Sequence, residues 1–157
     1  MNKKFYLLEF DEEVISEHLV AIHSHKEAYQ IAFYLNQTIN AKFKRTPKDL
    51  ENKAQKGSFT QFKWNDSNLD LECILFSNKA VLKEKLQTSN NLVLFKLPFR
   101  NEVSLITKLN KVDFFIKSTN NQSIEIIERK LKKWSEISFI YRVTTEKTIN
   151  QLNLIFD

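Results

Sequence analysis

The residues best suited to acid–base or metal chemistry lie close together in the first third of the chain. His23 and His25 flank Ser24, where an apolar run gives way to a helical pattern. Two imidazoles one residue apart could bind a metal ion if both turned toward one point and a third ligand joined them. His18 and Cys73 are the other soft candidates for that third ligand. A strand-to-helix junction explains the same pair without any metal.

Ser24 and Glu27 have the S-x-x-E spacing of a capping box, in which the serine hydroxyl and the glutamate side chain each accept a backbone N–H of the first turn. Apolar residues then recur every three or four positions, as on one side of a helix, at Ala28, Ile31, Ala32, Leu35 and Ile39. We therefore predict a helix over residues 25–38. His23 would be the last strand residue and His25 the first helical one.

Carboxylates at two other places could also take part in chemistry. Asp70 and Glu72 form a D-x-E pair that would hold a divalent cation if partner ligands joined it, although a solvated strand face explains the pair more simply. Asp113 stands in an otherwise apolar strand, where a carboxylate commonly bridges to a neighbouring loop. If the protein is an enzyme, His23, His25 and Asp113 are its candidate catalytic residues.

Composition excludes several kinds of site. The 157 residues include one glycine, Gly57, so the chain has neither a P-loop nor a G-x-G-x-x-G fingerprint, both of which need glycine close to a phosphate. One cysteine and three histidines exclude a cysteine-rich structural zinc site, and the motifs G-x-S-x-G and H-E-x-x-H are absent. We expect no cofactor and no metal, and we favour a protein that is not an enzyme.

Basic and aromatic residues alternate in the stretches AKFKRTPK and FTQFKWND. The residues that could contact nucleic acid or a partner there are Lys42, Lys44, Arg45, Lys48, Phe62, Lys63 and Trp64. On a strand, Phe62 and Trp64 would share one face, which a base-stacking platform requires, and a net charge of +5 favours polyanions. The same alternation is typical of an amphipathic strand with its aromatic side chains inward.

The elements that would position these residues are mostly short strands. We predict strands at residues 5–10 and 19–23, a basic extended piece ending at Pro47, a β-hairpin from FTQFKWND and LDLECILF, a short helix within 78–91, and further strands at 91–98, 112–119, 138–145 and 149–157. In LDLECILF, the residues on one face would be Leu69, Leu71, Cys73 and Leu75. A second helix is indicated by the stripe Ile124, Ile127, Leu131 and Trp134.

Residues 1–157, of which 42% are hydrophobic, suit a single globular domain. The segments Leu19–Arg45 and Val112–Val143 share a strand, helix, strand order. Strands outnumber helices, and the helices are long enough to cover one face of a sheet. We therefore predict an α+β fold, a two-layer sandwich whose mixed or mostly antiparallel sheet carries two main helices.

Several stretches occur in an order and spacing that resemble one known family: LVAIHSHKEAYQIAFYLNQ, KFKRTPKDL, LFSNK, ITKLNKVDFFIK and LNLIF. They resemble the IPExxxVDY family of uncharacterised small bacterial proteins over most of the chain. Ile106, Val112 and Asp113 match the naming motif. The family's proline, glutamate and tyrosine are replaced here, by Thr107, Lys108 and Phe114. The resemblance implies a small bacterial cytoplasmic domain and assigns no function.

The favoured functional hypothesis is a non-enzymatic binding or adaptor domain that acts through protein–protein contact. Thirteen phenylalanines and two tryptophans give more aromatic surface than a core of this size needs. The alternative is binding of RNA or single-stranded nucleic acid through the basic, aromatic-interleaved stretch. No apolar run is long enough to span a membrane, and Glu9 and Asp11 interrupt the first apolar run, so we expect a cytoplasmic protein of unspecified oligomeric state.

Overall fold

A computed structural model of the protein describes residues 17–52, 57–82 and 101–144. In these ranges the chain forms the helices α1 (Ala28–Ile39) and α2 (Asn121–Lys132) and the short 3-10 helix η1 (Thr107–Leu109). The strands are β1 (His18–Ser24), β2 (Lys44–Arg45), β3 (Leu50–Asn52), β4 (Gly57–Phe59), β5 (Gln61–Asp66), β6 (Leu71–Ser77), β7 (Lys79–Leu82), β8 (Asn101–Ser104), β9 (Phe114–Ser118) and β10 (Ile137–Val143). None of the described helices is both long and apolar enough to cross a bilayer.

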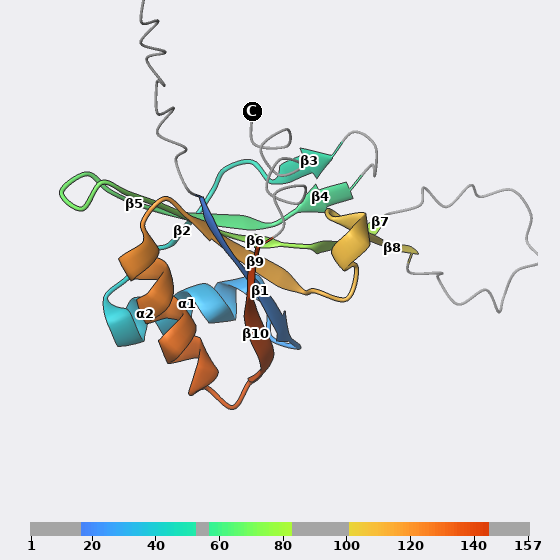
Figure 1. The fold of residues 1–157 in the computed structure, drawn as a ribbon. Helices are drawn as coiled ribbons and strands as arrows, with labels where there is room; N and C mark the ends of the chain where they lie inside the picture. Colours follow the sequence, from blue (N-terminus) through green and yellow to red (C-terminus); the bar gives the residue numbers. More distant parts are fainter. Residues whose placement is uncertain (1–16, 53–56, 83–100, 145–157) are drawn as a thin grey trace, which may run out of the picture.

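Within the described residues, six strands form the main sheet in the order β10-β1-β9-β6-β5-β2 (Figure 1), and every neighbouring pair is antiparallel. Because β1 pairs antiparallel with both β9 and β10, those two strands run parallel to each other. The helix α2 connects them across β1, and α1 connects β1 to β2 at the opposite edge of the sheet. The predicted α+β sandwich and the two strand, helix, strand units are confirmed.

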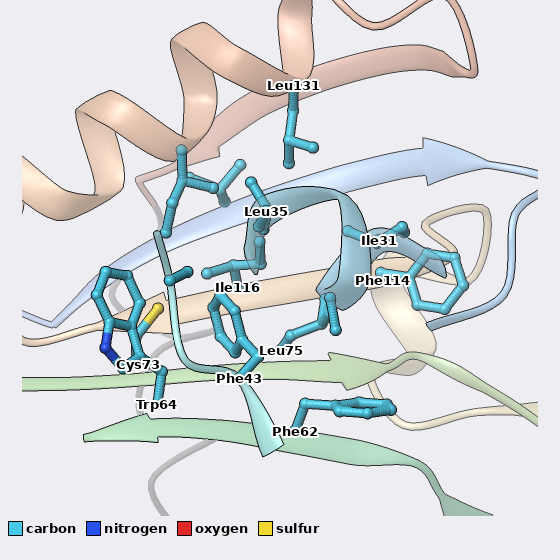
Figure 2. Close-up of a cluster of buried hydrophobic side chains, with 14 of the residues drawn as sticks. Ile31, Leu35, Phe43, Phe62, Trp64, Cys73, Leu75, Phe114, Ile116 and Leu131 are labelled. Carbon is cyan, nitrogen blue, oxygen red and sulfur yellow. The ribbon is translucent and has the colours of Figure 1, made fainter. Parts of the chain in front are cut away.

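Both helices cover the same face of the main sheet and enclose a hydrophobic core with it (Figure 2). Ile31 and Leu35 of α1, Leu131 of α2 and the strand residues Leu75 and Ile116 meet there, each with an exposed fraction of 0%. Burial of each such side chain stabilises the fold by about 1.5–3 kcal/mol. The apolar stripes of the two helices therefore explain why both pack on one face.

The opposite face of the main sheet is covered by two short two-stranded sheets, β3 with β4 and β7 with β8. A second hydrophobic core lies beneath them, with Phe59, Phe76 and Phe115 among its fully buried side chains. This partial third layer adds to the predicted sandwich. Figure 1 shows these two-stranded sheets on the side of the main sheet away from α1 and α2.

The helix α1 begins later than the sequence predicts. Its N-cap is Glu27, and the capping box joins Glu27 to Gln30. Ser24 remains paired as the last residue of β1, so its hydroxyl accepts the N–H of Lys26 instead of capping the helix. His25 lies in the bend between strand and helix. The predicted box of Ser24 with Glu27, and the helical position of His25, are therefore wrong.

The predicted β-hairpin is confirmed as β5 and β6. Its turn includes Leu69, which is exposed and does not share the buried face with Leu71. Asp70 also lies in the turn, with a positive φ of 47°, whereas Glu72 is in β6. The two carboxylates are therefore not neighbours on one strand face.

The predicted short helix within 78–91 is wrong for its described part, because residues Lys79–Leu82 form β7. They pair with β8, and Ala80 packs into the second core. The predicted helix at Ile124 is confirmed as α2, although Trp134 packs on the core from just beyond its end. The strands predicted at 5–10, 91–98 and 149–157 lie outside the described residues.

Candidate functional site

The outer side of α1 carries exposed aromatic side chains beside an apolar hollow. Tyr29 and Phe33, one turn apart, expose 61% and 64% of their surface. A groove of about 780 Å³, which we call the α1 groove, lies against this side of the helix. Its aromatic lining comes from α1, from the β2–β5 edge and from just beyond the end of α2: Tyr29, Phe33, Tyr34, Phe43, Phe62 and Trp134.

The sequence of α1 explains why these side chains face outward. The residues that α1 buries follow one stripe, Ala28, Ile31, Ala32 and Leu35. Tyr29 and Phe33 fall on the other side, where a surface helix normally carries charged residues. The twelve residues of α1 include no charged side chain. An apolar patch left on the outside of a helix in this way is typical of an interaction site.

The walls of the α1 groove are fixed by aromatic stacking and by one amide. The rings of Tyr34 and Trp134 stack at 4.0 Å with an angle of 7° between their planes. The side chain of Asn36 donates to the carbonyl of Phe43 at 3.0 Å and accepts the N–H of Phe43 at 2.9 Å. These contacts hold the segment after α1 against the helix. The groove is therefore formed before any partner binds.

Lys26 is the only charged residue among those described that lines the α1 groove. Its Nζ lies 3.6 Å from a carboxylate oxygen of Glu136, and the same oxygen lies 3.1 Å from Nε2 of His25. One carboxylate thus faces two basic side chains. Nearby, the guanidinium of Arg45 packs over the lining residue Phe62, 5.8 Å from its ring centre.

A smaller hollow of about 110 Å³ lies beside the end of α1, between Ile39 and Ile126. Three basic side chains of α2 and its C-cap complete it, and we call them the basic rim: Arg129, Lys130 and Lys133. In the part of the chain that the structure describes, none of the three forms an ion pair. The rim therefore places three basic side chains, none of them in an ion pair within the described residues, next to exposed apolar surface.

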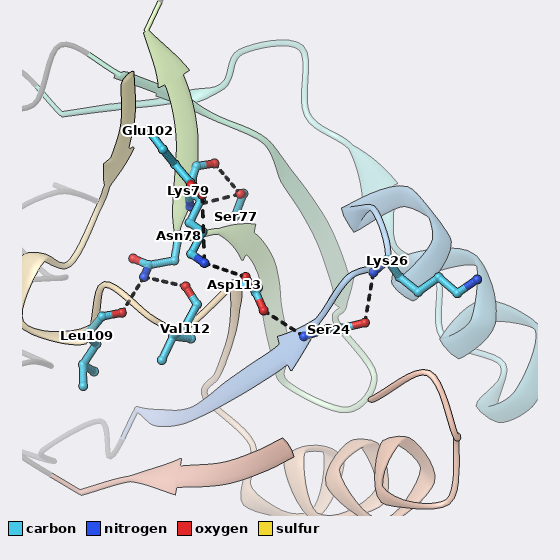
Figure 3. Close-up of polar contacts among 9 residues, drawn as sticks. All are labelled: Ser24, Lys26, Ser77, Asn78, Lys79, Glu102, Leu109, Val112 and Asp113. Atoms are coloured by element: carbon cyan, nitrogen blue, oxygen red, sulfur yellow. Dashed lines mark hydrogen bonds and ion pairs between the residues drawn. The ribbon is translucent and has the colours of Figure 1, made fainter. Parts of the chain in front are cut away.

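The carboxylate of Asp113 connects two strands, β1 and β7 (Figure 3). Its Oδ2 accepts the N–H of Ser24 at the end of β1, at 2.9 Å, and its Oδ1 lies 2.9 Å from Nζ of Lys79 in β7. The same Nζ is 3.9 Å from Glu102 in β8. A polar pocket of about 380 Å³ opens here, and His25 also lines it. Because Ser24 and Lys79 already engage both carboxylate oxygens, these contacts describe a structural bridge.

Sequence reasoning missed Asn78, which lies beside this bridge. Its side chain is fully buried, donates to the carbonyls of Leu109 and Val112 at 2.8 Å each, and accepts the N–H of Ile106 at 2.9 Å. All of its partners are backbone groups of the segment before β9. Nothing in the local sequence distinguishes this asparagine from one in an ordinary turn.

The structure brings two of the three candidate catalytic residues to one pocket. Asp113 and His25 both line the polar pocket, whereas the ring of His23 packs between Phe139 and Tyr141 at the β1–β10 edge. Among the described residues, no group of three or more His, Cys, Asp or Glu side chains is placed to hold a metal ion. His23 and His25 are therefore close in sequence because β1 ends between them, and the bend after β1 places them in different surroundings.

The aromatic residues of the predicted nucleic-acid surface point inward. Phe62 and Trp64 each expose 8% of their surface and belong to the core beneath the helices. They do not form an exposed base-stacking platform, so the alternative explanation, an amphipathic strand, is correct. Lys63 lies between them in β5 and therefore points to the other face of the sheet.

The basic residues of that surface are divided between the two faces. Lys44 pairs directly opposite Lys63, so both side chains lie on the face away from the helices. Arg45 lies on the helix side, where it packs on Phe62 and pairs with Asp49. The remaining two, Lys42 and Lys48, are exposed.

Comparisons of this chain with known protein families, with curated proteins and with solved structures found no match. The resemblance to the IPExxxVDY family stays a prediction.

Proposed function

We propose that the protein is a non-enzymatic, cytoplasmic binding or adaptor domain that holds a segment of another protein in the α1 groove. The observation that carries this proposal is the exposure of Tyr29 and Phe33 on an uncharged helix beside that groove. Aromatic side chains at the centre of an interface are the ones that dominate binding energy. Their replacement there costs about 2 kcal/mol or more.

The fixed walls of the groove support the same proposal. A preformed site loses less conformational entropy on binding than a flexible one, so a short segment can bind with useful affinity. The stacked pair Tyr34 and Trp134 and the Asn36–Phe43 hydrogen bonds supply this rigidity. A partner segment would place its apolar side chains between the exposed rings of α1 and these walls.

The test compares three tagged forms of the full chain, each expressed in the organism that naturally makes the protein. They are wild type, Phe33→Asp and Phe139→Asp. Phe139 is a matched control, because it exposes 59% of its surface but lies in β10, away from the groove. We expect one set of partners to be recovered with wild type and with Phe139→Asp, and to fall about tenfold or more with Phe33→Asp. Quantitative mass spectrometry of the purified complexes measures this. Equal recovery with all three forms would contradict the proposal.

Binding of RNA or single-stranded nucleic acid is the second candidate, and one observation favours it. Lys44 and Lys63 lie directly opposite each other, an arrangement that repels, and neither forms an ion pair within the described ranges. A phosphate backbone would relieve that repulsion. This candidate predicts partners that disappear after ribonuclease treatment. It also predicts RNA binding that weakens in Lys44→Ala with Lys63→Ala, with a shallower dependence on salt; RNA affinity unchanged by both substitutions would exclude it.

A further inference from the structure

We infer that the α1 groove takes an acidic segment of a partner protein, whose apolar side chains cover α1 and whose Asp or Glu side chains reach the basic rim. The inference rests on the proposed function and adds the chemistry of the partner. The inference is based on the surface around the groove, which is apolar along α1 and positively charged beside it.

The middle of the site offers apolar contact without charge. The helix α1 has twelve residues, and at about 1.5 Å per residue it presents about 18 Å of surface to a partner. Along that length Tyr29 and Phe33 protrude, and the polar lining consists of uncharged amides such as Gln30 and Gln37. A partner segment that covered this surface would need apolar side chains there.

Positive charge lies beside both ends of this apolar surface. Lys26 precedes α1, and its Nζ lies 3.6 Å from a carboxylate oxygen of Glu136. This distance is longer than the 2.9 Å between Nζ of Lys132 and Glu128. Charge-assisted hydrogen bonds are typically about 2.7–2.9 Å long, so Lys26 has capacity for a second carboxylate. The basic rim lies beside Ile39, the last residue of α1. The two groups of cations are therefore placed to bind carboxylates on either side of apolar anchors.

The basic rim also has a structural explanation, which accounts for only part of the observation. Cations in the last turn of a helix interact favourably with its dipole, and Arg129 and Lys130 occupy that position in α2. The dipole does not explain why Ile126 exposes 47% of its surface among them, next to Ile39. Apolar and basic side chains together form a surface that matches an acidic apolar segment.

Two other occupants fit this charge distribution less well. A nucleic-acid strand along α1 would place several phosphates over a helix that has no charged side chain. A second copy of this chain, packed face to face, would bring two basic rims and two net charges of +5 together. An acidic segment avoids both penalties.

A library of random twelve-residue peptides displayed on phage tests the inference against four forms of the full chain. These are wild type, Phe33→Asp, a rim variant and a charge-matched control. The rim variant carries Lys130→Gln and Lys133→Gln, which remove charge without opposing the helix dipole. The control removes the same charge from two exposed lysines away from the groove, in Lys108→Gln and Lys111→Gln. Circular dichroism and thermal unfolding of each form confirm that it folds.

We expect peptides that depend on Phe33 to contain apolar residues together with Asp or Glu. The most enriched peptide, synthesised with a fluorescent label, should bind the rim variant about tenfold more weakly than wild type, and the charge-matched control about as well as wild type. Peptides that depend on Phe33 but show no acidic bias would overturn the inference and leave the proposed function intact. If no peptide depends on Phe33, the proposed function fails. A dimer of the wild type that Phe33→Asp dissociates in sedimentation velocity would assign the groove to a second copy instead.

Discussion

Two polar side chains decide how the segment before β9 sits against the main sheet. Asp113 bridges β1 and β7, and Asn78 satisfies three backbone groups with no exposure to water. A buried backbone group without a partner costs about 1–3 kcal/mol. These side chains therefore act by satisfying main-chain groups in a segment that has little regular structure of its own.

Replacement of Asn78 by alanine leaves the carbonyls of Leu109 and Val112 and the N–H of Ile106 without this partner. We expect the free energy of unfolding to fall by about 3 kcal/mol, because desolvation of the Val112 carbonyl and the Ile106 N–H is no longer compensated, whereas the Leu109 carbonyl keeps the N–H of Val112. Urea denaturation followed by tryptophan fluorescence measures the change. Asn65→Ala, at an exposed asparagine of β5, serves as control and should change stability by less than about 0.5 kcal/mol. Similar small effects at both positions would contradict the role given to Asn78.

For a single residue, the sequence predicts a structural role only where the polarity of that residue differs from the polarity of its neighbours. Asp113 interrupts an apolar run, and the sequence predicts that it lies in a strand and bridges to a neighbouring loop; in the structure it lies just before β9 and its carboxylate contacts the strand residues Ser24 and Lys79 instead. Asn78 has no such contrast, because its partners lie about thirty residues away in the chain. Tyr29 and Phe33 differ from the buried members of α1 only in which side of the helix they occupy.

Among the elements, α2 is fixed to the edge strand β10 through one carboxylate. Glu128 accepts a hydrogen bond from the Nε–H of Arg142 in β10 at 2.7 Å and pairs with Lys132 at 2.9 Å. Burial works against the charged form, but the hydrogen bonds from Arg142 and Lys132 outweigh it and lower the pKa of Glu128 below its ordinary value of 4.5. The contact therefore favours the folded state as long as Glu128 is ionised.

Because the folded-state pKa of Glu128 is depressed, its contribution to stability is present above pH 4.5 and is lost as the pH falls through the lower, folded value. We expect Glu128→Gln to cost about 1 kcal/mol at neutral pH and progressively less in acid. Urea denaturation over a series of pH values measures this. The control is Glu125→Gln on the same helix, whose partner Asn121 is uncharged. A difference between wild type and Glu128→Gln that stays constant with pH would contradict the assignment.

The long elements were predictable and the short ones were not. The apolar stripes of α1 and α2 repeat over three turns, so both helices are evident from spacing alone. The start of α1 was misplaced because Ser24 stays in the sheet, which no local pattern reveals. The four-residue strand β7 is defined by its pairing with β8, and a segment that short has no distinctive period.

Over the whole molecule, the sheet and both helices share one core that contains the single cysteine. Cys73 is fully buried in β6 beneath the helices, near Trp64 (Figure 2). Burial raises the pKa of its thiol to about 12, although a hydrogen bond with Ser118 acts in the opposite direction. A thiol in this position reacts only when the core opens.

Labelling of Cys73 by iodoacetamide should therefore report global unfolding. We expect the native protein to react about a thousandfold more slowly than the urea-unfolded protein at the same pH, because the reactive fraction equals the unfolded fraction. Mass spectrometry of timed samples measures the rate, and Cys73→Ala gives the unlabelled baseline. A native rate within about tenfold of the unfolded rate would show that this core opens locally.

The α+β class and a mixed or mostly antiparallel sheet follow from chain length and from the order of strand-like and helix-like runs. The α1 groove does not, because it is formed by residues from three distant segments, including Phe43, Phe62 and Trp134. The third layer could not be predicted from the sequence either, because β3 and β4 have three residues each and such short strands show no periodic pattern. The functional surface is therefore a property of the packed molecule and not of any one motif.

The position of β1 between β9 and β10 affects how the protein can be made. During synthesis β1 leaves the ribosome well before either of the strands that flank it in the finished sheet. Its residues Leu19–Ile22, at most 2% exposed in the folded protein, then have no cover. An apolar strand with open edges is prone to pair with other chains, so we expect nascent and truncated forms of this protein to aggregate more readily until β10 has emerged.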